Sequence, residues 1–274
     1  MRRFLYGALG TAVAGCGFSN ATEGDGGPPP PDACVTYSAQ LDTCKLPMGP
    51  ALELSGMLEM NTTTGALIDK VTGVTITITT MSVGTLEAPV QAILAERVTF
   101  APNTTLRAIG PRGLAIVSSH SITLGANALI DVSNNGAGAR LSVCDPRGPT
   151  KGENDAGGAG GGGGAGFGGA GGKGGDGNGD DVVGNRSAGG DPGIAVEAPL
   201  GPRGGCPGAP GGDGDEPGGP GGRGGGAVWL AAGHTIALAA GAGINAGGGG
   251  GSGGTRVTSQ GDAGGGGGGS GGVI

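Results

Sequence analysis

The stretch of sequence that decides the fold covers residues 98–132 and reads VTFAPNTTLRAIGPRGLAIVSSHSITLGANALIDV. An apolar pair with one residue between its members returns in this stretch every eight residues without a gap. Apolar residues that alternate at period two predict a short strand with one buried face, and the constant spacing leaves a corner of a few residues between strands. The five pairs are Val98/Phe100, Leu106/Ala108, Leu114/Ile116, Ile122/Leu124 and Ile130/Val132.

Three such strands make a turn of 24 residues, which aligns Val98 with Ile122. Coils of this size, stacked so that equivalent positions lie above one another, are typical of a parallel β-helix. We therefore expect an all-β fold built on a short parallel β-helix-like coil with three strands per 24-residue turn. Asn103 and Asn127 would share one corner, either as a ladder of hydrogen-bonded amides or as turn residues that tolerate an unusual backbone.

The same pattern returns at an offset of 114 residues, which aligns Ile122 with Ile236 and predicts one more coil. Residues 136–226 are then an excursion from a single corner, and a second glycine-rich run leaves that corner after the last pair. Val273 and Ile274 stand where the next strand is expected. Because an open end of stacked strands invites pairing, we expect either a gene that continues beyond Ile274 or self-association through the last coil.

Residues 52–93 keep the eight-residue phase less faithfully, although the pairs at 74/76 and 90/92 fit it. We interpret this part as an amino-terminal β cap or an irregular first coil, with a small separate β-sandwich as the alternative. Residues 74–79 alternate strictly and predict the clearest strand of the chain. The expected organisation is a signal peptide (1–16), a Pro/Gly-rich tether (17–33), the β cap (34–93), β-helix coils (94–135), a glycine-rich excursion (136–226), a returning coil (227–246) and a glycine-rich tail (247–274).

The chain contains 72 glycines and only 3% aromatic residues, which is too few large side chains for one big core. Glycine runs either stay mobile or satisfy one another through backbone hydrogen bonds. Other residues fall three apart within residues 167–176 and 217–223, which favours polyproline-II type helices with three residues per turn. A flexible glycine-rich loop is the alternative. A collagen triplet is interrupted at Pro217.

The amino terminus has the basic start and short apolar run of an export signal. Val13-Ala14-Gly15-Cys16 at its end resembles the bacterial lipobox, so we expect lipidation of Cys16. This predicts an exported protein that a lipid holds in the outer membrane or at the cell surface of a bacterium. The formal net charge of −7 and the lack of a basic cluster argue against nucleic acid as a partner.

Four cysteines remain beside Cys16, and an exported protein favours their pairing. Cys34 and Cys44 are close in sequence, while Cys144 and Cys206 lie near the two ends of the long excursion. We expect one disulfide within each pair, although the sequence allows three connectivities.

Asp176, Asn178 and Asp180 place oxygen atoms at alternate positions of a glycine-rich loop, as short calcium loops do. They make a weak calcium candidate, with a solvated acidic loop as the alternative; no other cofactor is indicated. A polysaccharide-cleaving enzyme would need carboxylates that project together from one face. The predicted outward positions of the coils make no such cluster: Thr99, Arg107, Ala115, Thr123 and Asp131. The only two histidines, His120 and His234, fall at the same corner of equivalent coils, which repeat geometry explains without catalysis.

Several of these segments, from residues 98–132 through the glycine runs to Gly-Gly-Ser270-Gly-Gly-Val-Ile, resemble the glycine-rich predicted lipoproteins that are abundant in myxobacteria. The resemblance implies location and architecture but no reaction. We therefore expect a non-enzymatic, surface-exposed lipoprotein with a structural, adhesive or partner-binding role toward a cell-surface glycan or protein. The alternatives are a polysaccharide-active β-helix enzyme, and an ice-binding or calcium-dependent adhesin module.

Overall fold

The computed structural model describes residues 36–38, 41–42, 45–84, 89–139, 148–178, 186–196, 202–255 and 262–274. The chain divides into two units, Met1–Ala33 and Cys34–Ile274, and all of the described residues belong to the second. Every regular element among them is a β-strand, and they contain no helix. The prediction of an all-β fold is therefore confirmed for the described part of the chain.

The strands are β1 (Thr36–Ser38), β2 (Leu41–Asp42), β3 (Leu52–Leu54), β4 (Met57–Asn61), β5 (Ala66–Asp69), β6 (Thr75–Ile76), β7 (Thr80–Gly84), β8 (Pro89–Phe100), β9 (Thr105–Ile109), β10 (Gly113–Leu124), β11 (Leu129–Asp131), β12 (Val228–Ala232), β13 (Thr235–Leu238) and β14 (Gly243–Asn245). Sheet I has the order β12-β10-β8-β3, with β13 also paired to β10 and β7 to β8. Sheet II has the order β14-β11-β9-β4-β5-β6. β1 and β2 pair with each other.

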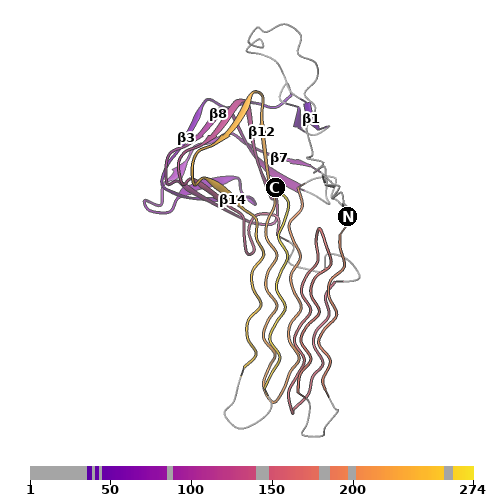
Figure 1. The fold of residues 1–274 in the computed structure, drawn as a ribbon. Coiled ribbons are helices and arrows are strands. Elements are labelled where there is room, and N and C mark those ends of the chain that lie inside the picture. Colours follow the sequence, from indigo (N-terminus) through magenta and orange to yellow (C-terminus); the bar gives the residue numbers. More distant parts are fainter. Residues whose placement is uncertain are drawn as a thin grey trace, which may run out of the picture. The chain divides into compact units, whose positions relative to one another are not determined.

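The parallel ladders have the register that the sequence predicts. In sheet I, Ile122 of β10 lies opposite Val98 of β8 on one side and opposite Ile236 of β13 on the other. In sheet II, Ile130 of β11 lies between Leu106 of β9 and Ile244 of β14. Both offsets, 24 and 114 residues, are therefore confirmed as backbone pairings. Figure 1 shows β3, β8 and β12 of sheet I on the other side of the interior from β14 of sheet II.

Two of the three strands predicted for each turn are halves of one long strand. The pairs at 114/116 and 122/124 both lie in β10, and the corner between them is a β-bulge. Ser119 and His120 oppose the single residue Glu96 of β8 there. A bulge bends a strand, and the hydrogen-bonded ladder continues on both sides of it. The predicted corner therefore forms inside β10, and the strand is not interrupted there. The observed architecture is two open sheets instead of three separate faces.

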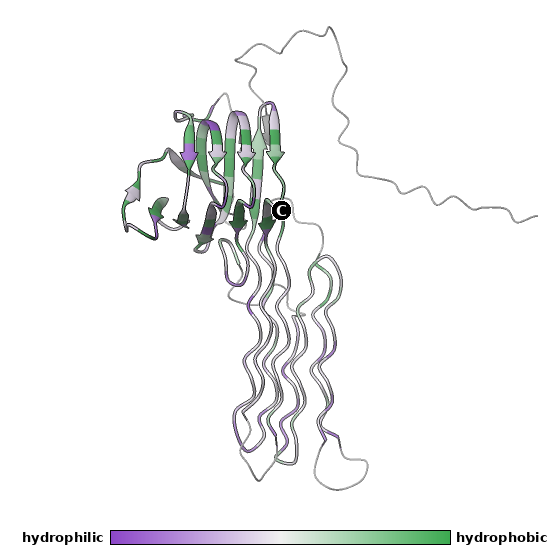
Figure 2. Ribbon diagram, turned by 60° about the vertical axis from the view of Figure 1, so that its left-hand side comes forward, coloured by the Kyte–Doolittle hydropathy of each residue, from purple (hydrophilic) through white to green (hydrophobic). Residues whose placement is uncertain are grey.

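The main core lies between the two sheets and is built from the inward members of the predicted pairs. Phe100, Leu106, Leu114, Ile122 and Ile130 all belong to it, and each is almost completely buried. In Figure 2 the hydrophobic colouring gathers on the strands, while the glycine-rich segments are pale. The period-two pattern therefore identified the core correctly along this stretch.

A second, smaller core covers the outer side of sheet I. It contains Ala115, and the prediction that this residue faces solvent is wrong. Val90 and Ala92 also belong to the second core, because the register of β8 on β10 shifts by one residue at the bulge. A shift of one residue reverses the faces of a strand. Ile93 consequently lies opposite Ile116 and packs in the main core, where the sequence had predicted Val90 and Ala92.

The amino-terminal strands extend the two sheets. β3 pairs in parallel with β8, and β4 pairs in parallel with β9, so residues 52–61 do not belong to a separate sandwich. β5 and β6 then add to β4 in antiparallel order. The strand predicted over residues 74–79 is mostly wrong, since only Thr75 and Ile76 pair and Val74 is 58% exposed. The chain crosses here to sheet I, where the amide of Leu94 donates to the carbonyl of Thr79 at 2.9 Å.

The glycine-rich residues contain no strand, yet their backbones are hydrogen-bonded to one another. We call residues 148–178, 186–196, 202–226, 247–255 and 262–272 the glycine bundle. The amides of Gly161 and Gly164 donate to the carbonyls of Gly175 and Gly172, each at 2.8 Å, so that the partners repeat every three residues. This is the repeat of polyproline-II helices that lie side by side. Figure 1 shows the segments running alongside one another away from the strands. The described residues favour the hydrogen-bonded alternative over a flexible loop.

Close approach of the backbones explains where glycine is required. A Cβ atom at Gly163 would overlap the carbonyl oxygen of Asp191, and one at Gly267 would overlap the carbonyl oxygen of Gly163. A Cβ atom at Gly172 would meet nothing within 4 Å. A segment with neighbours on every side therefore reads GGGGG at residues 160–164, whereas a segment at the edge reads AGGKGGD at residues 170–176.

Candidate functional site

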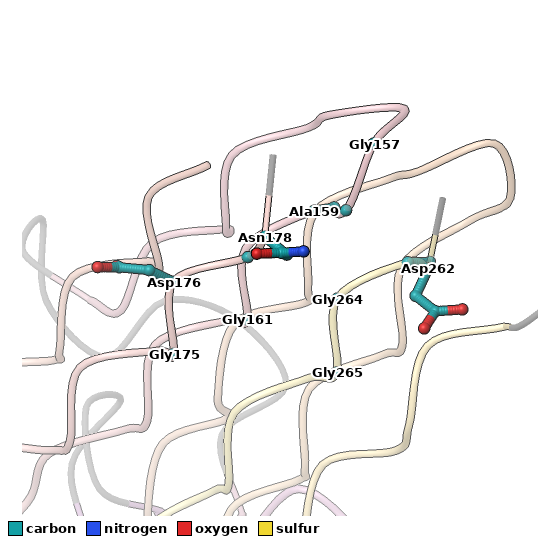
Figure 3. Close-up of a pocket in the computed structure, with 12 residues that line it drawn as sticks. Gly157, Ala159, Gly161, Gly175, Asp176, Asn178, Asp262, Gly264 and Gly265 are labelled. Atoms are coloured by element: carbon teal, nitrogen blue, oxygen red, sulfur yellow. The ribbon is translucent and has the colours of Figure 1, made fainter. Parts of the chain in front are cut away.

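The predicted calcium ligands lie at one end of the glycine bundle. Asp176 and Asn178 line an open hollow of about 450 Å³, together with Asp262 and backbone from three glycine-rich segments. In Figure 3, Asp176 and Asp262 lie on opposite sides of Asn178, and their side chains point away from each other. Asp180, the third predicted ligand, lies outside the described residues. Calcium takes about six to eight oxygen ligands that converge on one point, and the described side chains do not do so.

The carboxylate of Asp176 holds two neighbours in place. Its Oδ1 accepts a hydrogen bond from the amide of Gly189 at 2.9 Å and another from Nζ of Lys173 at 3.2 Å. The bond from Gly189, followed by those to Lys173, lowers the pKa of this carboxyl group below its ordinary value. Asp176 therefore ties the segment of residues 169–178 to that of residues 186–196. The arrangement supports the alternative of a solvated acidic loop, while the calcium site itself stays a prediction.

Asp213 plays the same part in the neighbouring segments. Its carboxylate accepts a hydrogen bond from the amide of Gly218 at 2.9 Å and pairs with Nζ of Lys151. Its own amide donates to the side chain of Asn154 at 2.8 Å. The bond from Gly218, and then that from Lys151, lowers the pKa of Asp213. Sequence reasoning missed this cluster, because its members are about 60 residues apart and only the folded bundle brings them together.

The outer face of sheet II carries the charges that a polysaccharide-active site would need, but they neutralise one another. Arg107 lies between Glu59 and Asp131 in the ladder and donates to Asp131 at 2.7 Å. Glu59 pairs with Lys70 at 3.2 Å. Burial raises the pKa of Asp131, but hydrogen bonds from Ser133 and then from Arg107 outweigh it, and the pKa is lowered. Each carboxylate of this row thus has a cation beside it, which suits structure better than acid catalysis.

The two histidines lie against each other at the bulge corner. Their ring centroids are 4.5 Å apart with the planes tilted by 55°, and the amide of His234 donates to the carbonyl of His120 at 2.8 Å. The sequence aligned them correctly, but it gave no sign that the rings themselves would touch. Among the residues that the structure describes, no three His, Cys, Asp or Glu side chains gather where they could hold a metal ion.

Cys206 is buried and forms a disulfide bond. Cys144, its predicted partner, lies outside the described residues, as do Cys16, Cys34 and Cys44. Both the pairing and the lipidation of Cys16 therefore stay predictions. Peptide mapping under non-reducing conditions would identify the partner of Cys206.

In comparisons with known proteins, no family model, no curated protein and no solved structure matches the chain. The resemblance to glycine-rich lipoproteins rests on the sequence segments alone. The described residues include no helix that is long and apolar enough to cross a membrane.

Proposed function

We propose that this chain is a non-enzymatic lipoprotein that displays a rigid glycine bundle at a bacterial surface for structural, adhesive or partner-binding purposes. The single observation that carries the proposal is the hydrogen-bonded order of the glycine-rich residues. A segment such as residues 160–164 has no side chains for chemistry, and its amides are used in contacts with neighbouring segments, as for Gly161 and Gly164. What such a bundle offers a partner is its shape and the few side chains at its edges.

In this proposal the two sheets act as stacked coils of a parallel β-helix with one corner opened to release the bundle. The support is that β8, β10 and β13 align at the predicted offsets while β9, β11 and β14 align in the other sheet. Both glycine-rich runs leave after the same position, β11 in one layer and β14 in the next. Backbone bonds join the runs to this corner, since Asn134 donates to Gly247 and Gly226 donates to Val132. The coil would thus fix the root of the bundle.

The side chains available for recognition stand on the outer edges of the bundle. Lys173 is exposed on one edge segment, and Pro217, Pro220 and Arg223 are exposed at intervals of three on another. On each edge some of the intervening glycines approach neighbouring backbone, since a Cβ at Gly174 would overlap the carbonyl oxygen of Gly161 and one at Gly221 would overlap that of Gly208. The spacing presents side chains in a row about 9 Å apart, since a polyproline-II helix rises about 3.1 Å per residue. A cell-surface glycan or protein is the class of partner that fits such a row.

The binding test compares the wild type with Lys173→Ala and Arg223→Ala against glycans and cell-surface material. Lys70→Ala, at an exposed lysine on the sheets, is the matched control. We expect the bundle variants to lose binding and the control to keep it. Binding that survives both bundle variants would contradict recognition by the edges.

The anchor is tested separately by cell fractionation. Cys16→Ser should move the protein from the membrane fraction to the soluble exported fraction, because the thiol is the proposed site of the lipid. An unchanged distribution would refute the lipid anchor and leave the binding role to stand on its own test.

A further inference from the structure

The rings of the only two histidines of the chain lie against each other, with their planes tilted by 55°, at the bulge corner of sheet I. His120 belongs to β10, and His234 immediately precedes β13. They lie 114 residues apart in sequence, but their ring centroids are 4.5 Å apart. The backbone bond from His234 to His120 fixes the register, so the rings cannot slide past each other along the strands. The chain has only two histidines in 274 residues, and the fold brings both to the same place.

The corner that carries them is rigid. The hydroxyl of Ser118 donates to the carbonyl of Glu96 at 2.7 Å and accepts from the amide of His120 at 3.1 Å. This ties the bulge of β10 to the strand below it, and the amide of Gly233 donates to the carbonyl of Ser118 at 3.0 Å, which ties it to the strand above. The ring of His120 is therefore held on a fixed backbone, half-buried, while that of His234 is exposed to solvent.

We propose that His120 and His234 together bind one divalent transition-metal ion, of which copper(II) is the tightest. Neutral imidazole is a preferred ligand of copper, nickel and zinc, with a metal–nitrogen distance of about 2.0–2.1 Å for zinc. Ring centroids 4.5 Å apart let one nitrogen of each ring reach a common ion after side-chain rotation alone. Two ligands on backbones that are hydrogen-bonded to each other lose little freedom on binding, which makes the pair a better chelator than two separate histidines.

The remaining coordination positions are left to water. Glu96 stands in the same row one layer below His120, but it does not form a three-ligand group with the histidines. Among divalent ions of the first transition row, affinity rises to copper and then falls at zinc, so a site with two imidazoles and open positions should follow the order copper, nickel, zinc. Calcium and magnesium prefer oxygen ligands and should not bind here.

The experiment titrates copper(II) chloride, nickel(II) chloride and zinc(II) chloride into the purified full chain at neutral pH. Isothermal calorimetry measures stoichiometry and affinity, and electron paramagnetic resonance of the copper complex reports the coordinating nitrogens. We expect one copper per chain with nitrogen coupling from two imidazoles. His120→Gln and His234→Gln should each weaken copper binding at least tenfold and leave a one-nitrogen spectrum.

Glutamine replaces each imidazole with a polar side-chain amide. Circular dichroism and urea unfolding show whether the variants fold. Ser119→Ala, at the half-buried neighbour of His120 in the bulge, is the matched control and should bind copper as the wild type does. Wild-type protein without a one-to-one copper complex would overturn the proposal, and so would folded single variants that retain wild-type affinity. Copper bound with single-nitrogen coupling in the wild type would also overturn it, since the pair would not be acting together.

Discussion

The side-chain amide of Asn127 donates a hydrogen bond to the side-chain oxygen of Asn103, 3.1 Å away in the next layer and 24 residues away in sequence. Both residues lie in the left-handed region, with φ of 56° and 60°. Gly241 occupies the equivalent corner of the following layer with φ of 75°. Both explanations that the sequence left open are therefore correct. The corner requires a positive φ, which asparagine tolerates, and the side-chain amides of Asn103 and Asn127 also form a ladder.

Replacement of Asn127 separates the two contributions. Asn127→Ala should lower the free energy of unfolding by about 2 kcal/mol, since alanine carries the left-handed strain and loses the ladder bond. Asn127→Gly should cost about half as much, because glycine accepts the positive φ as Gly241 does. Urea unfolding measures both. If glycine proves as costly as alanine, backbone strain does not govern this corner.

Burial should decide tolerance along β10. Leu124 is fully buried in the main core, whereas its neighbour Thr123 is half-buried and points away from it. Leu124→Asp would bury an unpaired carboxylate, so it should lower the free energy of unfolding by roughly several kcal/mol, at the upper end of the range for single substitutions. A loss of this size is enough to unfold the sheets. Thr123→Asp should be mild. Equal sensitivity of the two positions in thermal unfolding would show that the observed register of β10 is incorrect.

The glycine bundle should respond to a methyl group according to its surroundings. Gly163→Ala would drive a Cβ into the carbonyl oxygen of Asp191, so we expect loss of protection from hydrogen exchange throughout the bundle. Gly172→Ala has open space and should leave exchange unchanged. Neither residue has a positive φ, so the comparison isolates packing from backbone strain. A bundle that tolerates Gly163→Ala would not be packed as the structure has it.

Much of the strand register could be predicted from the sequence, because inward residues such as Ile122 and Ile130 repeat at a constant spacing and each repeat must stack on the last. The predictions failed where a second core covers sheet I and where the chain crosses from sheet II to sheet I. Ala115 is apolar but lies on the outer side, and only the packing of Trp229 and its neighbours shows that this side is covered. Val74 alternates with its neighbours and its carbonyl accepts from the amide of Asp69 at 2.9 Å, but the ladder with β5 contains only Thr75 and Ile76. Alternation of apolar residues indicates which side chains share a face of a strand. Where the strand begins and ends depends on the partner strand that it pairs with.

The candidate site was less predictable. Residues 167–176 showed their period of three in the sequence, which correctly indicated the spacing of the bundle. The partners of each segment could not be read, because glycine carries no side chain that would distinguish one neighbour from another. The contact of Asp213 with Lys151 follows from those pairings, so it appears only with the fold. The sequence did align His120 with His234, but only the structure shows that their rings touch.

The contacts of the Asp213 carboxylate with Gly218 and Lys151 should make the glycine bundle sensitive to acid. The folded-state pKa of this carboxyl group is lowered from 3.8, so the charged form is favoured by folding. Its stabilising contribution is then present above the unfolded value and is lost as the pH falls through the folded value. Asp213→Asn should lower the urea midpoint at neutral pH, and the difference from wild type should vanish in strong acid. Asp215→Asn, at an exposed position two residues away, is the control. A difference that persists in strong acid would mean that charge is not its cause.

The last prediction concerns the exposed layer at β13. Ile236 and Leu238 are 43% and 49% exposed, although the equivalent residues of the layer below, Ile122 and Leu124, are fully buried. In the described part of the chain β13 pairs with β10 alone, so the backbone groups on its outer side face no strand. An apolar strand edge of this kind is a template for another chain.

We expect two copies to pair through this edge, because an edge related to itself by a two-fold axis is self-complementary. Ile236→Lys should abolish the association, since a charge on an edge strand opposes pairing. Ile194→Lys is the matched control, as Ile194 is 38% exposed but belongs to the glycine bundle. Sedimentation over a range of concentrations measures the mass. A wild-type protein that stays monomeric at all concentrations, or an association that Ile194→Lys disrupts equally, would show that the open layer is not the contact.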